Sequence, residues 1–154
     1  NLLLKMETTH RQSRETRAIV RQAGKHSTLN VHFVNQNEKY LTGLYDLEVL
    51  TLPRMMIPAV EIKQSHTTTV EIPGPGIAVI KKSTNGYGSL YVERNNRQEW
   101  IYNLAEETVQ ESLLLQPGHY RVVFRPRYAR ASVYTIEKTF EISSGLTTQV
   151  DIFR

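Results

Sequence analysis

The sequence contains no cysteine, which excludes a disulfide framework, a thiolate nucleophile and any metal site built on cysteine ligands. It also lacks a strong net charge of either sign, because 19 Lys and Arg residues are largely balanced by 15 Asp and Glu residues, and the net charge is +4. Proteins dedicated to nucleic acids carry denser basic stripes than this. We therefore expect an ordinary globular chain whose partner is not a nucleic acid.

Long apolar runs are missing as well. The first run, Leu2 to Leu4, is too short for a signal peptide and far below the roughly 20 residues that a membrane helix needs. We therefore expect no transmembrane segment in this chain. Because the chain starts at Asn1 inside a strand-like run, we interpret it as a piece of a longer protein. The sequence alone leaves the compartment open.

Hydrophobic residues alternate with polar residues along most of the chain, and this period of two is typical of β-strands. Clear examples are the segments 60–63, 70–72, 100–104 and 120–124. Each is bounded by Gly, Pro, Asn or Ser, as short strands of a sandwich are. From the alternation we predict that Trp100, Tyr102 and Leu104 face the core, which for Trp100 we favour over a role as a sugar-binding platform. The pair Asn95-Asn96 predicts a tight hairpin turn, because asparagine tolerates positive φ angles.

An internal repeat divides the sequence. Residues 59–72 (AVEIKQSHTTTVEI) match residues 139–152 (TFEISSGLTTQVDI) without a gap, and six of the fourteen positions are identical. A Gly-x-Tyr followed by a strand precedes each copy, at 43–49 and 118–124, and the second copy holds five extra residues between its strands. A weaker match sets 18–20 against 90–92. We therefore predict two domains, 1–74 and 75–154, joined by the stiff connector Pro73-Gly74-Pro75-Gly76.

The fold class expected from this pattern is all-β: two tandem small antiparallel β-sandwiches, immunoglobulin-like or transthyretin-like, with about seven strands each. The pattern leaves the strand order open. Tyr45 and Tyr120 are in phase with the apolar residues after them, so we predict that Gly43 and Gly118 form tight turns that deliver these rings into the interior. The predicted strands are 2–6, 17–22, 28–34, 39–42, 44–51, 57–63 and 67–73, then 77–81, 88–94, 98–104, 112–116, 119–125, 133–142 and 147–153.

These motifs resemble the small β-sandwich modules of the PEGA and carboxypeptidase-regulatory type. More narrowly, YDLEVLTLPR, VEIKQSHTTTVEIP and QPGHYRVVFR resemble the C-terminal region of Bacteroidetes von Willebrand factor A proteins, often labelled calcium-activated chloride channel-like. The resemblance implies a surface or periplasmic protein whose metal-binding A domain precedes this region. The Asp-x-Ser-x-Ser metal motif of that domain is absent here, since neither Asp46 nor Asp151 is followed by such serines. No metal function carries over.

Residue patterns for catalysis are also missing. No Gly-x-Ser-x-Gly motif occurs, and the prolines of the connector remove the amides that a phosphate-binding loop needs. Glu61 and Glu141 are expected on outward faces of separate units rather than across one cleft. The histidines lack metal-ligand spacing, and we expect them to be exposed strand and loop residues; they are His10, His26, His32, His66 and His119. We therefore expect neither enzymatic activity nor a cofactor.

Two basic clusters remain as candidate contact sites. One is the loop of the second repeat, where Arg125, Arg127, Tyr128 and Arg130 combine cations with an aromatic ring; the other is segment 10–17. We expect a non-catalytic accessory or scaffolding module that positions a neighbouring domain of the same polypeptide or binds another protein. The alternative is a carbohydrate-binding module that uses exposed aromatic residues, for which the candidates are Tyr87, Tyr91 and Tyr128. A row of exposed rings would favour this alternative, and inward-packed aromatics would favour scaffolding.

Overall fold

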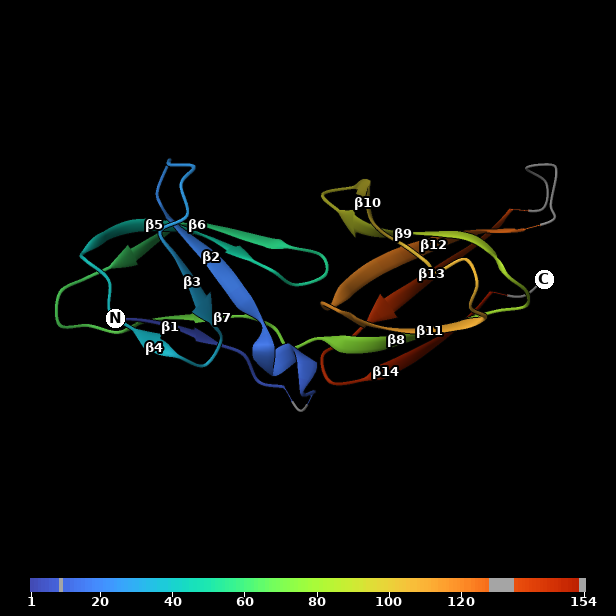
Figure 1. The fold of residues 1–154 in the computed structure, drawn as a ribbon, viewed down its shortest axis with the longest axis horizontal. Helices are drawn as coiled ribbons and strands as arrows, with labels where there is room; N and C mark the ends of the chain where they lie inside the picture. The colour runs from blue at the N-terminus through green and yellow to red at the C-terminus, as the bar shows by residue number, and fades with distance from the viewer. Residues whose placement is uncertain (9, 128–134, 153–154) are drawn as a thin grey trace. The chain divides into compact units, whose positions relative to one another are not determined.

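The computed structural model describes residues 1–8, 10–127 and 135–152, most of which lie in β-strands or in the turns between them. Contacts between residues divide the chain into two compact units, Asn1–Gly74 (unit 1) and Pro75–Arg154 (unit 2), as Figure 1 shows. Each unit holds one three-stranded and one four-stranded sheet. The all-β class and the two small sandwiches that the sequence predicts are therefore confirmed.

Unit 1 has the strand order β3-β2-β5-β6 in its larger sheet and β4-β1-β7 in its smaller sheet. A 3₁₀ turn, η1 (Gln12–Glu15), forms within the basic segment 10–17, where no helix was predicted. The fourth strand is shorter and earlier than predicted, because the chain after Glu38 already crosses to the other sheet. The strands are β1 (Leu2–Lys5), β2 (Arg17–Gln22), β3 (Asn30–Phe33), β4 (Asn37–Glu38), β5 (Gly43–Val49), β6 (Met55–Ile62) and β7 (Thr68–Glu71).

Unit 2 repeats this order strand for strand, as β10-β9-β12-β13 and β11-β8-β14. Gly76, which the sequence placed in the connector, is already the first residue of β8, and the carbonyl of Pro75 accepts a hydrogen bond of 3.0 Å from Gly145 N–H. The strands are β8 (Gly76–Lys82), β9 (Gly86–Arg94), β10 (Arg97–Asn103), β11 (Gln110–Leu115), β12 (Gly118–Pro126), β13 (Ile136–Ile142) and β14 (Thr147–Ile152).

The sheets are not antiparallel throughout, which corrects one part of the prediction. In each unit the first and last strands pair in parallel, β1 with β7 and β8 with β14, and the other pairings are antiparallel. The immunoglobulin order would place the first, second, fourth and fifth strands in one sheet. Here the first and second strands lie in different sheets, so the transthyretin-like alternative is the one retained.

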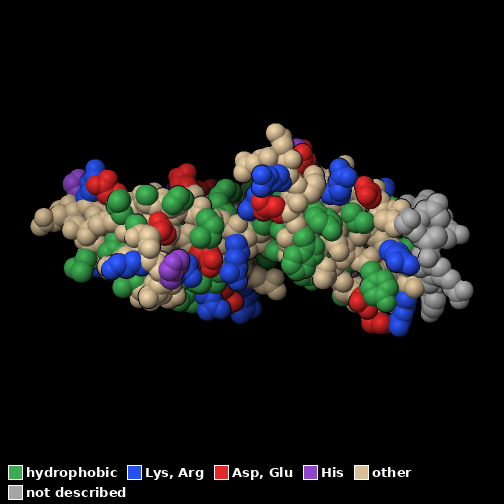
Figure 2. Space-filling model, turned by 90° about the horizontal axis from the view of Figure 1, so that it is seen from above, with side chains coloured by type: hydrophobic (Ala, Val, Ile, Leu, Met, Phe, Trp, Pro, Cys, Tyr) green, Lys and Arg blue, Asp and Glu red, His purple; other side chains and the backbone are tan. Residues whose placement is uncertain are grey.

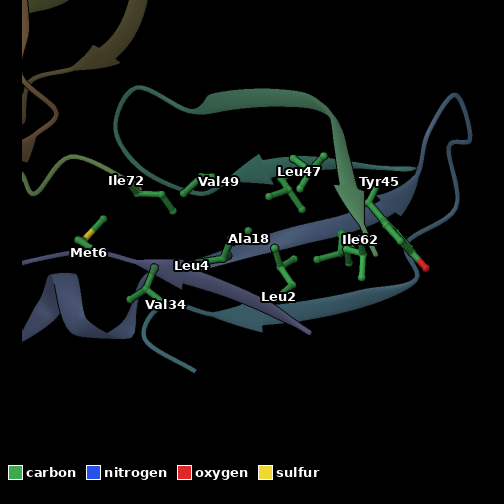
Figure 3. Close-up of a cluster of buried hydrophobic side chains, with 12 residues drawn as sticks. Leu2, Leu4, Met6, Ala18, Val34, Tyr45, Leu47, Val49, Ile62 and Ile72 are labelled. Carbon is green, nitrogen blue, oxygen red and sulfur yellow. The ribbon is translucent and has the colours of Figure 1, made fainter. Parts of the chain in front are cut away.

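The core of each unit lies between its two sheets and consists of the inward half of the alternating pattern. In unit 1, Leu2 and Leu4 from β1 face Leu47 and Val49 from β5, and all four side chains are fully buried. Figure 3 shows these side chains directed toward one another from the two sheets. Unit 2 has the same arrangement, with Ala78, Ile80, Val122 and Phe124 buried. Burial of such side chains contributes about 1.5–3 kcal/mol each.

A buried tyrosine ties the crossover between the sheets to the core of each unit. The Tyr45 hydroxyl donates to the carbonyl of Leu41 at 2.6 Å, and the Tyr120 hydroxyl donates to the carbonyl of Gln116. Both rings are buried, as predicted. The glycine two residues earlier is the first residue of a strand rather than part of a turn; its φ is +153° at Gly43 and +156° at Gly118, a region that favours glycine. This geometry matches the tyrosine corner of other β-sandwiches.

Substitution of Tyr120 tests this anchor. Tyr120→Phe removes one buried hydrogen bond and is expected to lower the free energy of unfolding by about 0.5–1.5 kcal/mol. Tyr120→Ala also deletes a buried ring and is expected to cost about 3–5 kcal/mol. The control is Tyr87→Ala, at an exposed ring of the same unit, which should change stability by less than about 0.5 kcal/mol. Denaturant unfolding measures all three, and equal effects of the two alanine variants would contradict the anchor.

Candidate functional site

The basic loop that the sequence singled out is described only in part. Arg125 and Arg127 are exposed at the end of β12, whereas Tyr128 and Arg130 lie outside the described residues. The Arg127 guanidinium is 3.1 Å from the Glu107 carboxylate, and its backbone N–H donates to the Asn85 carbonyl. Arg125 stands opposite Tyr87 in the register of β12 and β9. The role of this loop in binding stays a prediction.

His32 contradicts the expectation that the histidines are exposed, because its side chain has no exposed surface. Its Nε2 is 2.6 Å from the Gln36 carbonyl, and its Nδ1 lies 2.9 Å from the Tyr40 hydroxyl and 3.1 Å from Glu38 Oε2. The Asn30 amide donates to both Glu38 and Tyr40. Burial is the largest cause that raises the pKa of Tyr40, to about 12. These four side chains form the polar cluster of unit 1.

Unit 2 has leucines at the positions of His32 and Tyr40, and Tyr102 at the position of Asn30. The Leu104 backbone N–H donates to the Gly88 carbonyl, so Leu104 stands opposite Gly88 as His32 stands opposite Ala18. Leu115 precedes Gly118 by the same number of residues as Tyr40 precedes Gly43. The fold therefore does not require polar residues at the positions of His32 and Tyr40. Among the described residues no group of three His, Cys, Asp or Glu side chains could hold a metal ion. Within the same residues, no helix is long and apolar enough to span a membrane.

The outer face of the four-stranded sheet of unit 1 carries several exposed apolar side chains among charged ones. Strand β3 reverses the usual sandwich pattern: Asn30 and His32 point inward, while Val31 and Phe33 point outward and are 41% and 36% exposed. Ile19 of β2 lies opposite Val31, and the Arg17 guanidinium lies 5.8 Å from the centre of the Phe33 ring. We call Leu29, Val31, Phe33, Ile19 and Met56, which is 63% exposed, the apolar face of unit 1.

Asp46 holds the neighbouring backbone of this face in place. Its carboxylate accepts hydrogen bonds from the N–H groups of Ala59, at 3.0 Å, and Gly24, at 3.1 Å. Ala59 has a φ of +55° and lies where the register of β5 and β6 shifts. The bonds from Ala59 and Gly24, in that order, lower the pKa of Asp46. The ionised carboxylate thus fixes both the bulge in β6 and the turn after β2.

The corresponding face of unit 2 is aromatic and polar. Trp100 of β10 is 57% exposed, lies opposite Tyr91 of β9, and donates its indole N–H to Asn103 Oδ1 at 2.9 Å. Tyr87 lies on the same face of β9 and is 51% exposed. We call Trp100, Tyr91, Tyr87, Asn103 and Arg121 the aromatic face of unit 2. Figure 2 shows hydrophobic side chains among charged ones at the surface of both units.

The prediction that Trp100 faces the core is therefore wrong, and a β-bulge is the physical reason. The register shifts between Trp100 and Tyr102, so that Ile101 is an extra residue and the alternation breaks there. Leu104 is buried as predicted. The Tyr102 hydroxyl donates a hydrogen bond to the Glu111 carboxylate. That bond is the largest cause that raises the pKa of Tyr102, to about 12.

Strand register allows the two outer faces to be compared position by position. With Tyr45 set against Tyr120, Ile19 corresponds to Ser89 and Val31 to Asn103. The weaker sequence match of 18–20 with 90–92 is thus wrong by two residues. Other equivalent positions differ as strongly, since Arg17 and Arg21 of unit 1 are replaced by Tyr87 and Tyr91 in unit 2. Outside the polar cluster of unit 1 the inner faces are mostly apolar in both units, whereas the outer faces have different chemistry.

No protein-family model matches the sequence, and no curated protein does either. Among solved structures, the pilus adhesin SpaC from Lactobacillus rhamnosus GG is similar at a TM-score of 0.32 and 10% sequence identity. The similarity covers 98% of this chain and 30% of the adhesin chain. A similarity at this level assigns neither a function nor a site.

The pH dependence of stability tests the role of Asp46. Because its pKa is lowered in the folded protein, its contribution is present above the ordinary aspartate pKa of about 4 and is lost as the pH falls through the lower, folded value. Asp46→Asn should therefore melt at a lower temperature than the wild type at pH 7. The difference should shrink below about pH 4 in thermal melts over a pH series. A difference that stays constant down to pH 2 would contradict this role.

Proposed function

We propose that this chain is a non-catalytic accessory region of a larger surface or periplasmic protein of the von Willebrand factor A type, and that unit 1 docks a protein domain on its apolar face. The compartment and the larger protein rest on the sequence resemblance. The docking surface rests on the reversed pattern of β3, which is the observation that carries the proposal.

The reversed pattern is informative because it is costly in an isolated sandwich. Leu29, Val31 and Phe33 expose apolar surface, while His32 on the same strand is buried and needs the polar cluster as hydrogen-bond partners. A strand under no other constraint would place apolar residues inward and polar residues outward. Unit 2 has the buried Leu104 at the position of His32, which shows that this fold accepts an apolar residue there.

The surroundings of the apolar face favour a protein partner. Charged side chains lie among its apolar ones: the Glu48 carboxylate, which lies between Ile19 and Met56 in the strand register, pairs with Arg54 at 3.3 Å, and the Arg17 guanidinium lies over the Phe33 ring. Non-obligate protein interfaces likewise combine apolar with polar and charged side chains. Docking there would let the sandwich hold a neighbouring domain in a fixed position, which is the mechanism expected of an accessory region.

Binding to the A domain that the resemblance implies tests this proposal. The two proteins are produced separately and their affinity is measured by isothermal titration calorimetry. Val31→Glu places a charge in the apolar face and should weaken binding at least about tenfold. Because Val31 is exposed, this variant should keep the thermal stability of the wild type.

The matched control is Leu146→Glu, at an exposed apolar residue in the connection between β13 and β14 of unit 2, which should bind like the wild type. Two results would contradict the proposal. One is that the wild-type chain does not bind the A domain; the other is that Val31→Glu and Leu146→Glu bind equally well.

A further inference from the structure

Unit 2 carries a second surface whose chemistry differs from that of the apolar face. Trp100, Tyr91 and Arg121 stand in one row across β10, β9 and β12, in direct register. Neighbouring strands lie about 4.8 Å apart, so the row extends over roughly 10 Å. Tyr87 lies on the same face of β9, four residues or about 13 Å from Tyr91. The aromatic rings are therefore spread in two directions: Trp100 and Tyr91 across the strands, and Tyr91 and Tyr87 along β9.

The Trp100 ring is held in place although more than half of it is exposed. Its indole N–H donates to Asn103 Oδ1 at 2.9 Å, and the Ser89 hydroxyl donates to the same oxygen at 3.3 Å. An exposed ring that is already oriented loses little conformational freedom when a ligand stacks on it. The β-bulge at Ile101 turns this ring outward, and bulges of this kind commonly re-aim side chains at functional sites.

The fold itself does not require these residues. At the positions of Tyr87 and Tyr91 unit 1 has Arg17 and Arg21, and at the positions of Ser89 and Asn103 it has Ile19 and Val31. Unit 1 nevertheless forms the same sheets in the same order. The aromatic face is therefore a property of unit 2 alone, and packing within the sandwich does not explain it.

We infer that the aromatic face of unit 2 binds a neutral carbohydrate chain. The C–H groups on one face of a pyranose ring pack against flat aromatic rings, and its hydroxyls need both donors and acceptors at the edge. Trp100 and Tyr91 supply the rings, while the Asn103 amide and the Arg121 guanidinium supply polar groups beside them. This site lies on a different unit from the proposed protein-docking face and does not depend on it.

The charges around the rings favour a neutral sugar over an anionic one. The Arg121 guanidinium already pairs with the Glu137 carboxylate at 3.0 Å, and the Arg94 guanidinium lies 3.9 Å from the Glu99 carboxylate. Each of these two ion pairs is neutral overall, so the pairs give a carboxylated or sulfated glycan no net attraction. They leave hydrogen-bonding capacity for hydroxyl groups, because each carboxylate has further lone pairs.

The single tryptophan of the chain makes the inference directly testable, because intrinsic fluorescence reports on Trp100 alone. The probes are cellohexaose, xylohexaose, mannohexaose and laminarihexaose, titrated into the whole chain. At least one should shift the emission of Trp100 to shorter wavelength with a saturable dependence on sugar concentration. Calorimetry with that sugar should then show at least tenfold weaker binding for Trp100→Ala and for Tyr91→Ala.

Phe33→Ala is the matched control, since it removes an exposed ring from unit 1 and should leave sugar binding unchanged. Thermal melts of each variant confirm that unit 2 is still folded. The inference is overturned if none of the four sugars changes the emission, or if Trp100→Ala and Tyr91→Ala bind within twofold of the wild type. It is also overturned if the separately produced A domain, rather than any sugar, shifts the Trp100 emission, because the face would then be a protein interface.

Discussion

The hydrogen bond from a buried tyrosine hydroxyl to a carbonyl four residues earlier is the constraint on which both units depend. It occurs at Tyr45 and at Tyr120, at the point where the chain leaves the three-stranded sheet and enters the four-stranded one. Burial raises the pKa of the Tyr120 hydroxyl well above its ordinary value, so it stays protonated and can donate. Because this bond fixes the crossover, every second side chain of β5 and β12 points into the core. The side chains between them point to the outer face.

This division explains how one fold carries two kinds of surface. The parallel pairing of first and last strands closes each sandwich in the same way. The inward residues are mostly apolar in both units, the exceptions being the polar cluster around His32 in unit 1 and Lys82 and Tyr102 in unit 2. Outward positions are under no such constraint. Unit 1 has Ile19 and Val31 where unit 2 has Ser89 and Asn103, which is why protein docking and sugar binding are assigned to separate units.

Much of the fold follows from the sequence, because alternation and the repeat are local signals. They predict the class, most strands, the Asn95-Asn96 turn, where both φ angles are positive, and the burial of Tyr45 and Tyr120. Strand order and the parallel pairs depend on contacts between distant segments, which no local pattern records. The candidate surfaces were harder to predict. A single bulged residue, Ile101, turns Trp100 outward, against the prediction from alternation. In β3 a buried polar cluster accompanies the outward orientation of Val31 and Phe33, and alternation alone does not say which face of a strand is buried.

The solvent accessibility of Trp100 tests most directly the claim that the sandwich leaves a preformed aromatic face uncovered. Acrylamide quenching of the native chain reports on this one residue, because it is the only tryptophan. With 57% of its surface exposed, Trp100 should be quenched in the folded protein with a Stern–Volmer constant close to that of the urea-unfolded chain. Strong protection in the folded state, released only on unfolding, would show that the ring packs into the core, and it would contradict the account.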